Sequence, residues 1–499
     1  MNIISLFDHH VRQQPDKAFL RHAGRTYTYA QTDDLARRAA TFYARHGIAA
    51  GDRVAMMCFN TPGFVIAMLG AWRLGAVVVP VNHKLQAPEI DYVLAHASVK
   101  MAIFDGALAP VVGRLAYRTP KFGTDSELAG HPCFDTLIAR EAPFDGPPPA
   151  DDSVAEVLYT SGTTGKPKGC LHSHRTACHA AETAVKGASM KPDERTLIAM
   201  PLWHSSPLNN WFLGTLHVGG TVVLLREYHP QAFLQAVQDE RATLYFGAPV
   251  SYLLPLQMNL DIAAFDLSSM RAWIYGGGPI GADTARRLMA AYRSECFYQM
   301  FGMTETGPAG TVLYPREQIA KAGSIGRVCT PGSEMRVVRE DGLEARSGEV
   351  GEIWLRCDSL MLGYLDAPEA TAQAIADGWY RTGDLVRVDA DGYLFVVDRC
   401  KDMIVTGGEN VYSKEVEDVL IEHPAIRDVA VVGRPHPEWG ETVVAFVVPA
   451  EGSSIDTDAI NTFLSTRLAK YKIPREYIAR ELLPRTPTGK LAKPALRMG

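Results

Sequence analysis

The stretch "YTSGTTGKPKG" (residues 159–169) decides how the rest of the chain is interpreted. It contains three glycines, four Ser or Thr hydroxyls and two lysines, and it has no acidic residue. Hydroxyls and glycine amides of this kind surround phosphate oxygens, and a lysine can neutralise their charge. The stretch therefore predicts a phosphate-binding loop, and its candidate contacts are Thr160, Ser161, Gly162, Thr163, Thr164 and Lys168.

This loop differs from the phosphate loop of nucleotide hydrolases. Those proteins have a glycine, four variable residues, and then Gly-Lys followed by a Ser or Thr that binds magnesium. Here only two residues separate Gly162 from the pair Gly165 and Lys166, and Pro167 stands where the hydroxyl is required. The spacing is wrong and the magnesium-binding hydroxyl is missing, so the motif does not predict a P-loop hydrolase.

Length, composition and charge limit the class of protein. A chain of 499 residues is too long for one ordinary core, so we expect at least two domains. A composition of 47% hydrophobic and 21% charged residues is typical of globular proteins. The net charge of -6, without a long basic run, disfavours nucleic acid or an anionic membrane as the principal partner. Eight irregularly spaced cysteines favour reduced thiols and a cytoplasmic location.

The chain shows no pattern of a signal peptide or a membrane span. Its N-terminal segment lacks a basic start and a continuous apolar run. The most hydrophobic window, residues 64–81, is interrupted by Arg73 and ends in Pro80 and Val81. This window predicts a helix, a break at Gly75 and then a buried strand.

Short apolar segments alternate with helical segments through the first 300 residues. Strands are predicted at 76–81, 221–225, 242–249 and 270–277, and helices at 230–240 and 281–292. This alternation predicts a parallel α/β core. From about residue 320 the pattern changes to hairpin-like strands, and a compact α+β unit begins after residue 400. We place the domain boundary at residues 399–401.

Three further motifs complement the phosphate loop. In "YQMFGMTETG" (298–307), Glu305 offers the carboxylate oxygen that a magnesium ion bound to phosphates prefers. "YGGGPI" (275–280) would let an adenine ring lie against bare backbone, although a tight turn explains three glycines equally well. "WYRTGDL" (379–385) offers Asp384 as an acceptor for both ribose hydroxyls. The three glycines of the second motif are Gly276, Gly277 and Gly278.

Together with "VDRCKDMIVTGGENVYSKEVE" (397–417) and "PRTPTGK" (484–490), these motifs resemble those of the adenylate-forming superfamily, in the family order. That family includes acyl- and aryl-CoA synthetases, peptide-synthetase adenylation domains and beetle luciferases. The resemblance implies a large N-terminal domain, residues 1–399, of layered α/β sheets with a distorted β-barrel. It also implies a small mobile α+β lid, residues 400–499. Dimers are common in the family, so a homodimer is one expectation.

The reaction implied by the resemblance has two steps. A carboxylic acid attacks the α-phosphate of ATP to give an acyl-adenylate and pyrophosphate, and a thiol then displaces AMP to give a thioester. Because the two steps need different groups at one reaction centre, the resemblance implies a lid that swings on a hinge between them. ATP, Mg²⁺ and coenzyme A are therefore the expected cofactor and co-substrates.

Residue roles follow from the matching motif positions. Thr304 is expected to contact the α-phosphate, and Glu305 to bind Mg²⁺. Lys490 matches the catalytic lysine, whose ammonium meets the oxygens where negative charge builds during in-line attack. The remaining positions are Arg399 at the ribose, Lys401 as the hinge residue, and Gly407 and Gly408 as room for a narrow thiol arm.

Coenzyme A is the favoured thiol. "RPHPEWGE" (434–441) resembles the segment of CoA ligases in which Trp439 packs by the nucleotide part of CoA. The segment 468–477 adds side chains for stacking and for the 3′-phosphate: Tyr471, Lys472 and Arg475. A carrier-protein phosphopantetheine and a luciferase-like oxidation are the alternatives, and the basic residues could also form an ordinary solvated helix end. A catalytically inactive homologue is disfavoured because the motif residues are all present.

The segment "PLWHSSPLNNWFLG" (201–214) matches the family segment that lines the acid pocket. His204 occupies the position of a ring near the carboxylate, although it could also be a core histidine. Polar residues follow it where family members are usually more apolar, namely Ser205, Ser206, Asn209 and Asn210. Other lining candidates are Phe246, Gly247, Ala248, Gly276, Gly277, Met300 and Gly302. An aromatic ring or a medium chain would fit, and the identity of the acid stays open.

One cluster predicts a different site. In "CLHSHRTACH" (170–179), strand alternation would place Cys170, His172 and His174 on one face, near Cys178 and His179, as in a zinc site. The family, however, has an apolar residue at position 170 and a histidine at 174. We therefore favour a structural role for this cluster.

Overall fold

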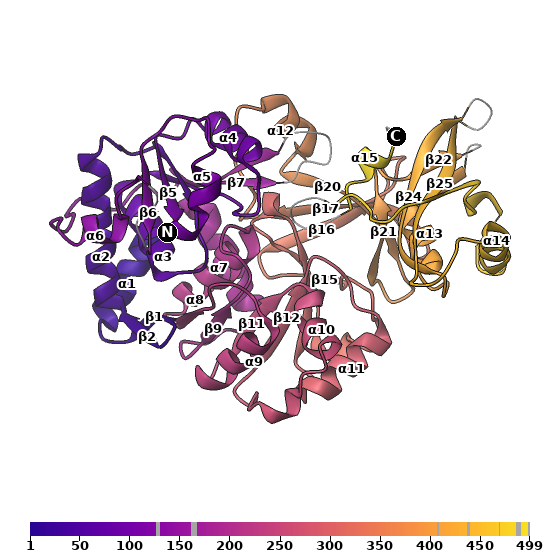
Figure 1. Ribbon diagram of the computed structural model, residues 1–499, viewed down its shortest axis with the longest axis horizontal. Helices are drawn as coiled ribbons and strands as arrows, with labels where there is room; N and C mark the ends of the chain where they lie inside the picture. The colour runs from indigo at the N-terminus through magenta and orange to yellow at the C-terminus, as the bar shows by residue number, and fades with distance from the viewer. Residues whose placement is uncertain are drawn as a thin grey trace. The chain divides into compact units, whose positions relative to one another are not determined.

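The computed structural model describes residues 1–125, 130–160, 167–406, 409–436, 440–468, 470–485 and 491–497 (Figure 1). The chain divides into two compact units. The first unit comprises Met1–Thr160, Pro167–Met335 and Leu355–Tyr380. The second comprises Arg336–Trp354 and the described residues from Arg381 onward.

One sheet of the first unit has seven strands in the order β18-β8-β7-β4-β3-β5-β6. β3 pairs in parallel with β4 and β5, and β4 with β7, whereas β8 runs antiparallel to β7 and β18. The helices α3 and α4 supply the crossovers that parallel strands require. The bounds are β3 Arg53–Met57, α3 Pro62–Leu74, β4 Val77–Pro80, α4 Ala87–His96, β5 Met101–Asp105, η1 Gly106–Leu108, α5 Ala109–Val112, β6 Lys121–Thr124, α6 Phe134–Ile138, β7 Val154–Thr160, β8 Lys168–Ser173 and β18 Gly363–Tyr364.

A second sheet has nine strands in the order β15-β14-β13-β12-β11-β9-β10-β1-β2. From β13 to β1 all neighbours are parallel, and antiparallel strands close both edges. Its strands are β1 Ala18–His22, β2 Arg25–Thr28, β9 Arg195–Ile198, β10 Thr221–Leu224, β11 Leu244–Gly247, β12 Ala272–Gly276, β13 Phe297–Gly302, β14 Gly310–Leu313 and β15 Val328–Cys329. The predicted parallel α/β core is confirmed.

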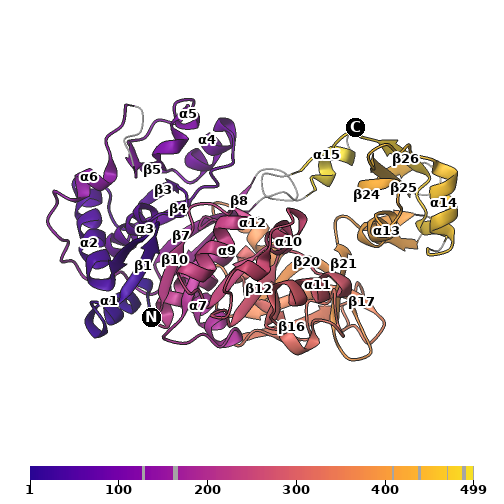
Figure 2. The same cartoon turned by 60° about the horizontal axis from the view of Figure 1, so that its bottom comes forward.

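Helices cover both faces of both sheets. One continuous core joins side chains of the two sheets to α1 (Ile3–Gln13), α2 (Tyr29–Arg45), α3, α7 (His174–Gly187) and α8 (Leu213–His217). Alternate residues of the seven-stranded sheet pack under α4 and α5, and those of the nine-stranded sheet pack under α9 (Pro230–Asp239), α10 (Pro249–Gln257) and α11 (Ala282–Tyr292). Figure 2 shows these last three helices side by side. The first unit is thus layered, with helices between and outside two sheets.

The window at residues 64–81 folds as the sequence predicts. α3 ends at Leu74, Gly75 adopts the left-handed conformation (φ 78°), and β4 follows. The helix is apolar all round and is buried, because it lies in the layer between the sheets. Arg73, its one charged residue, is buried against Asp8 and Asp33. Within the described part of the chain, every helix falls short of the length or the apolar character that a membrane crossing demands.

Two smaller sheets complete the chain. The first has the order β16-β17-β20-β19, with β21 on β20, and its described pairings form an open path where a distorted barrel was expected. The second has the order β23-β22-β25-β24, with β26 on β25, and is covered by α13 and α14 on one face and α15 on the other. The bounds are β16 Ser333–Val338, β17 Val350–Cys357, α12 Pro368–Ala374, β19 Ile375–Ala376, β20 Trp379–Val388, β21 Leu394–Arg399, β22 Ile404–Thr406, β23 Glu409–Val411, α13 Ser413–Leu420, β24 Ile426–His436, β25 Gly440–Pro449, α14 Thr457–Ser465, η6 Lys470–Lys472, β26 Glu476–Ala479 and α15 Lys493–Arg497.

All eight cysteines are unpaired, as the irregular spacing predicts. Two of them are exposed: Cys296 in the first unit and Cys400 in the second.

Candidate active site

The predicted acid and phosphate residues of the first unit follow the carboxyl ends of neighbouring parallel strands. β9, β11, β12 and β13 are adjacent in the nine-stranded sheet and point the same way. The segments that continue from them carry His204, Ala248, Gly277 and Thr304. Ligands of open α/β sheets bind at this edge, so the topology gathers the motif residues where a substrate can reach them.

The Thr304–Glu305 pair lies in η4 (Thr304–Thr306), two residues after β13. The hydroxyl of Tyr364 donates to Glu305 Oε1 over 3.0 Å. The hydroxyls of Thr304 and Ser205 are 3.0 Å apart, so this hydrogen bond joins the acid-pocket segment to the phosphate segment. His172 Nε2 donates to the Thr304 carbonyl over 2.8 Å. Burial lowers the pKa of His172 to about 4, so its ring is neutral.

The two stems of the phosphate loop are fixed by strand pairing. Thr160 ends β7 and faces Lys168 at the start of the antiparallel β8. Lys168 Nζ lies 4.9 Å from the centroid of the Tyr364 ring, which brings its positive charge next to the phenol that binds Glu305. The loop candidates Ser161, Gly162, Thr163 and Thr164 lie outside the described residues.

His204 and Ser205 precede an unusual helix. Residues Ser206–Phe212 form a π-helical segment, η2, which continues directly into α8. π-helical turns are rare and occur frequently at functional sites. The His204 ring packs on Trp203 with centroids 3.9 Å apart.

The two asparagines of η2 are buried. Asn209 Nδ2 donates to Glu156 Oε1 over 2.6 Å. Asn210 Nδ2 donates to the carbonyls of Ala180 and Gly307, each over 3.2 Å. Their amide nitrogens therefore bind protein groups, and they do not face solvent.

The glycines of the adenine and acid candidates differ in what surrounds them. A Cβ on Gly276 would lie 2.8 Å from the Met300 carbonyl oxygen, so close packing of β12 against β13 requires that glycine. Gly277 has φ 80° and open space around it, and Gly278 is nearly as open. Of the three glycines in this motif, Gly277 and Gly278 are the two with open space in which an adenine ring could lie against the backbone. At Gly247 and Gly302 a Cβ would clash with the protein itself, so the packing of neighbouring atoms requires glycine at both positions.

An aromatic wall borders this segment. Phe246 is half-buried and stacks on the buried Trp211, with ring centroids 5.5 Å apart and planes at 20°. Met300 and Ala248 are also half-buried. The ring of Phe246 lies 3.1 Å from the position of a Cβ on Gly276, so an apolar side chain borders this glycine segment.

The ribose candidates meet in the second unit. Asp384 on β20 and Arg399 on β21 are direct partners across the antiparallel pair. Arg399 Nε lies 2.5 Å from Asp384 Oδ1, and Arg399 Nη1 donates to the Thr382 carbonyl over 3.3 Å. Asp384 is buried while Arg399 is more exposed, so the guanidinium fixes the carboxylate at the end of the sheet.

The hinge candidate Lys401 follows this pair. Its ammonium is 4.0 Å from Asp402, and burial lowers its pKa. Arg497 donates to the Lys401 carbonyl over 3.0 Å and to Asp402 over 2.9 Å. The end of the C-terminal helix is thus bound to the segment predicted to be the hinge.

Three of the coenzyme A candidates, Tyr471, Lys472 and Arg475, lie among the described residues and contact protein groups. Lys472 Nζ contacts both carboxylate oxygens of Glu415 at 2.8 Å. Arg475 donates to the Thr406 hydroxyl over 3.1 Å. The Tyr471 ring centroid is 5.9 Å from Lys472 Nζ. Gly407, Gly408, Trp439 and Lys490 lie outside the described residues.

The cysteine and histidine cluster of residues 170–179 is dispersed. Cys170 packs with Met361, Tyr364 and Tyr380. His172 binds Thr304, and Cys178 belongs to the main core. Across the described ranges, no three His, Cys, Asp or Glu side chains are placed to hold one metal ion.

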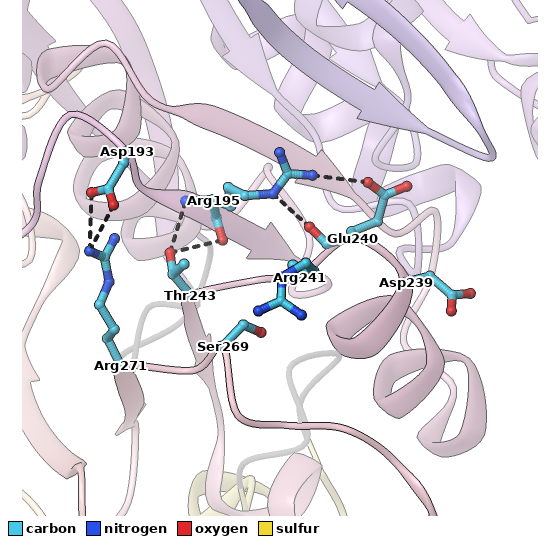
Figure 3. A pocket seen from close by; sticks show the side chains of 8 residues that line it. All are labelled: Asp193, Arg195, Asp239, Glu240, Arg241, Thr243, Ser269 and Arg271. Atoms are coloured by element: carbon cyan, nitrogen blue, oxygen red, sulfur yellow. Dashed lines mark hydrogen bonds and ion pairs between the residues drawn. The ribbon is translucent and has the colours of Figure 1, made fainter.

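A charged pocket of about 460 Å³ lies at the opposite, amino-terminal edge of the nine-stranded sheet (Figure 3). Its lining is Asp193, Arg195, Asp239, Glu240, Arg241, Thr243, Ser269 and Arg271. Arg271 pairs with Asp193 at 3.0 Å, and Arg195 donates to the Glu240 carbonyl over 2.6 Å. The guanidinium charges are compensated by acidic neighbours, and the pocket is remote from the strand ends that carry the motifs.

Comparison with known proteins places this geometry in a family. The family model of the AMP-binding enzymes matches residues 7–365, and that of the AMP-binding enzyme C-terminal domain matches residues 415–490. Feruloyl-CoA synthase of Amycolatopsis sp. is 38% identical over 486 residues, which cover 97% of this chain and 96% of that protein. Long-chain-fatty-acid–CoA ligase FadD13 of Mycobacterium tuberculosis is 36% identical over 476 residues, covering 94% and 92%. ATP-bound MatB from Rhodopseudomonas palustris is 31% identical, with a TM-score of 0.87, and covers 100% of this chain and 99% of that one.

The chain belongs to the family of AMP-binding, adenylate-forming enzymes. Within that family it is an AMP-forming acyl- or aryl-CoA ligase, as the sequence predicts. The reaction of this class converts a carboxylic acid and ATP into an acyl-adenylate and pyrophosphate, and then forms the CoA thioester with release of AMP.

Sequence reasoning missed several residues that shape this site. Tyr364, which binds Glu305, lies in a two-residue strand about 60 positions away along the chain. His172 was expected to have a structural role, and its partner, the Thr304 backbone carbonyl, was not predicted. No periodicity or motif in the sequence signals either contact.

Proposed function

We propose that this enzyme activates an aromatic carboxylic acid of the hydroxycinnamate type and transfers it to coenzyme A. The observation that carries the proposal is the aromatic wall of Phe246 on Trp211, beside the open backbone at Gly277. The similarity to a feruloyl-CoA synthase over nearly the whole chain supports it. A long-chain fatty acid is the second candidate, because the similarity to FadD13 is of the same order.

The proposed magnesium site is Glu305. A carboxylate beside a threonine hydroxyl is the hard oxygen donor set that Mg²⁺ prefers. Among the described residues, no cationic side chain forms an ion pair with Glu305, and its observed partner is the neutral phenol of Tyr364. The donor set therefore fits the ion. Bound there, Mg²⁺ would neutralise phosphate charge.

The remaining groups bind and orient ATP. We assign the α-phosphate to Thr304, whose hydroxyl is held by Ser205. The phosphate loop, Thr160 to Thr164 with Lys168, would hold the other phosphates, and Asp384 and Arg399 would hold the ribose. Lys490 would stabilise the negative charge that builds during attack on the α-phosphate.

The second step is assigned to the C-terminal lid. Residues 400–499 would swing about Lys401 after adenylation, so that Gly407 and Gly408 admit the thiol arm. Trp439, Tyr471, Lys472 and Arg475 would contact the nucleotide part of CoA. Lys472 would first have to leave Glu415. A carrier-protein phosphopantetheine is the alternative acceptor, and a cytoplasmic location and a homodimer stay predictions.

A panel of acids tests the proposal. ATP–pyrophosphate exchange is measured with ferulate, 4-hydroxybenzoate, octanoate, palmitate and malonate, and AMP release is then measured with and without CoA. We expect the fastest exchange with ferulate and AMP release that depends on CoA. Faster exchange with palmitate would favour the fatty acid, and no exchange with any acid would contradict the proposed function.

A further inference from the structure

A buried carboxylic acid lies inside the first unit, and no step of the reaction uses it. Glu156 sits in the middle of β7, four residues before the phosphate-loop stem at Thr160, and its side chain is 0% exposed. Its one described hydrogen-bond partner is the amide of Asn209, at 2.6 Å. Glu156 Oε2 and Asn209 Oδ1 are both buried and have no hydrogen-bond partner among the described atoms.

Among the residues that the structure describes, no cationic side chain is paired with Glu156. Its neighbours are Val78 on β4 and His172 on β8, its partners across the sheet, and Cys178 on α7, which is close enough to interact electrostatically. Burial lowers the pKa of His172 to about 4 and raises that of Cys178 to about 12, so both are neutral. A buried carboxylate without a cation is strongly disfavoured, whereas a protonated carboxyl also supplies a donor for an otherwise unpaired oxygen. Burial raises the pKa of Glu156 to about 7.

The partner of Glu156 belongs to the acid-pocket segment. Asn209 lies in the π-helical η2, three residues into a turn that begins directly after Ser205. Ser205 in turn bonds the Thr304 hydroxyl, and Asn210 bonds the Gly307 carbonyl. The Asn209 bond therefore ties η2 to the strand that leads into the phosphate loop, and the other two tie it to the Thr304 segment. π-helical turns are rare, and here the side-chain contacts of Asn209 and Asn210 hold the segment against its neighbours.

We propose that Glu156 acts in its neutral form as a positioning residue for the acid substrate, by holding Asn209 and thereby the η2 segment beside His204 and Ser205. Glu156 touches no reacting atom. When it ionises, the charge draws water or displaces η2, and the acid pocket loses its shape. The ATP site is disturbed less, because only Thr304 among its proposed contacts in the described residues is bonded to this segment. This inference rests on the proposed function, because it assigns the acid to the segment after His204.

The test compares wild type with Glu156→Gln in ATP–pyrophosphate exchange without CoA, from pH 6 to pH 9. Ferulate, or the panel acid with the fastest exchange, is the probe. Glutamine is isosteric with the protonated acid, can exchange two hydrogen bonds with Asn209 and does not titrate. In wild type we expect the KM for the acid to rise about tenfold for each pH unit above 7, with a much smaller rise in the KM for ATP. In Glu156→Gln the KM for the acid should stay within about twofold over this range.

Glu194→Gln is the matched control, because it neutralises another buried carboxyl at the far edge of the nine-stranded sheet. It should keep the wild-type pH profile. A rise in Glu156→Gln equal to that of wild type would overturn the inference. So would loss of acid binding at pH 6 in a Glu156→Gln protein with a native circular dichroism spectrum.

An infrared measurement separates this inference from the proposed function. The carboxylic-acid C=O stretching band of Glu156 should appear in the wild-type minus Glu156→Gln difference spectrum at pH 6 and should disappear by pH 8. If no acid supports exchange, the proposed function fails, while this band still reports the state of Glu156. Absence of the band at pH 6 would overturn the neutral form and the positioning role with it.

Discussion

Tyr364 supports the magnesium candidate through a single phenol hydroxyl. Its side chain is buried, and burial raises its pKa, so the hydroxyl keeps its proton and can only donate to Glu305. A donor on one carboxylate oxygen fixes the orientation of the other. Preorganisation of this kind lets the carboxylate receive a metal ion without rearranging.

The variant Tyr364→Phe removes this hydroxyl and little else. We expect the Mg²⁺ concentration for half-maximal exchange to rise about tenfold, because a hydrogen bond to a charged group is worth about 1.5 kcal/mol. The KM for the acid should not change. Tyr117→Phe, which removes a hydroxyl bonded to the Val99 carbonyl, is the control. Equal Mg²⁺ dependence in wild type and Tyr364→Phe would contradict the role of Tyr364.

Glu156 also predicts how stability changes with pH. Its pKa is raised from 4.5 to about 7 in the folded state, so the folded protein binds this proton more tightly than the unfolded chain does. Stability from this group is complete below pH 4.5 and is lost as the pH rises to 7, by about 3 kcal/mol in all. The difference in urea midpoint between wild type and Glu156→Gln should therefore grow between pH 5 and pH 7, in favour of the glutamine variant. A constant difference would contradict the raised pKa.

The roles of some residues can be predicted from the sequence, and the roles of others cannot. Glu305 and Asp384 stand in motifs whose chemistry can be derived from the side chains alone. Glu156, His172 and Tyr364 act through burial and through partners that are far away in the chain, and one sequence carries no sign of such contacts. The steric constraint on Gly276 comes from the carbonyl of Met300 on the adjacent strand, and the motif alone does not reveal it.

Helices and strands were predicted correctly where the spacing of hydrophobic residues and the position of a helix-breaking glycine or proline indicate the same boundaries. The helix, Gly75 break and strand at residues 64–81 follow directly from a continuous apolar run with one glycine. The predicted strands of the parallel core became β4, β10, β11 and β12. The π-helical η2 was not predicted, because an inserted residue in a helical turn leaves no signature in the hydrophobic pattern. Its stabilisation by Asn209 and Asn210 comes from tertiary contacts.

The C-terminal helix α15 is anchored by a buried lysine. Lys493 Nζ contacts Glu417 at 2.8 Å and the Ser413 hydroxyl at 2.5 Å, and Asp398 accepts from the same hydroxyl. Burial raises the pKa of Glu417 and of Asp398, and the lysine opposes both shifts. The helix that follows the catalytic-lysine motif is thus bound to α13 and to the end of β21.

Lys493→Met should show how strongly the buried carboxylates of Glu417 and Asp398 destabilise the fold when no cation is paired with them. Removal of their cation should destabilise the second unit by about 3 kcal/mol at pH 8, because an uncompensated buried charge remains. The loss should be smaller at pH 5, where protonation removes the charge. Urea unfolding and limited proteolysis measure the effect, and Lys470→Met, on the exposed surface of η6, is the control. A loss of stability that does not depend on pH would mean that Lys493 stabilises the second unit through packing and not through its charge.

At the scale of the whole molecule, we proposed that Lys490 serves adenylation and that the hinge at Lys401 serves thioester formation. Opposite defects are therefore expected in two variants. Lys490→Ala should reduce adenylation by a factor of at least 10³ and spare thioester formation from preformed acyl-adenylate, because its charge serves the first step alone. Lys401→Pro should leave adenylation largely intact and impair thioester formation, because proline restricts the hinge. Single-turnover assays of each half-reaction provide the measurement. Equal loss of both steps in either variant would remove its assigned role.

The two exposed cysteines provide a test of the proposed movement of the lid. Cys296 and Cys400 belong to different units, and the other six thiols are buried or half-buried. Burial raises the pKa of Cys400 to about 12, so Cys296 should react first with a maleimide, and a second dye can then be attached at Cys400. Because Cys400 directly precedes the proposed hinge residue Lys401, its rate of modification, with Cys296 blocked first, would report rotation at the hinge in the unmutated enzyme.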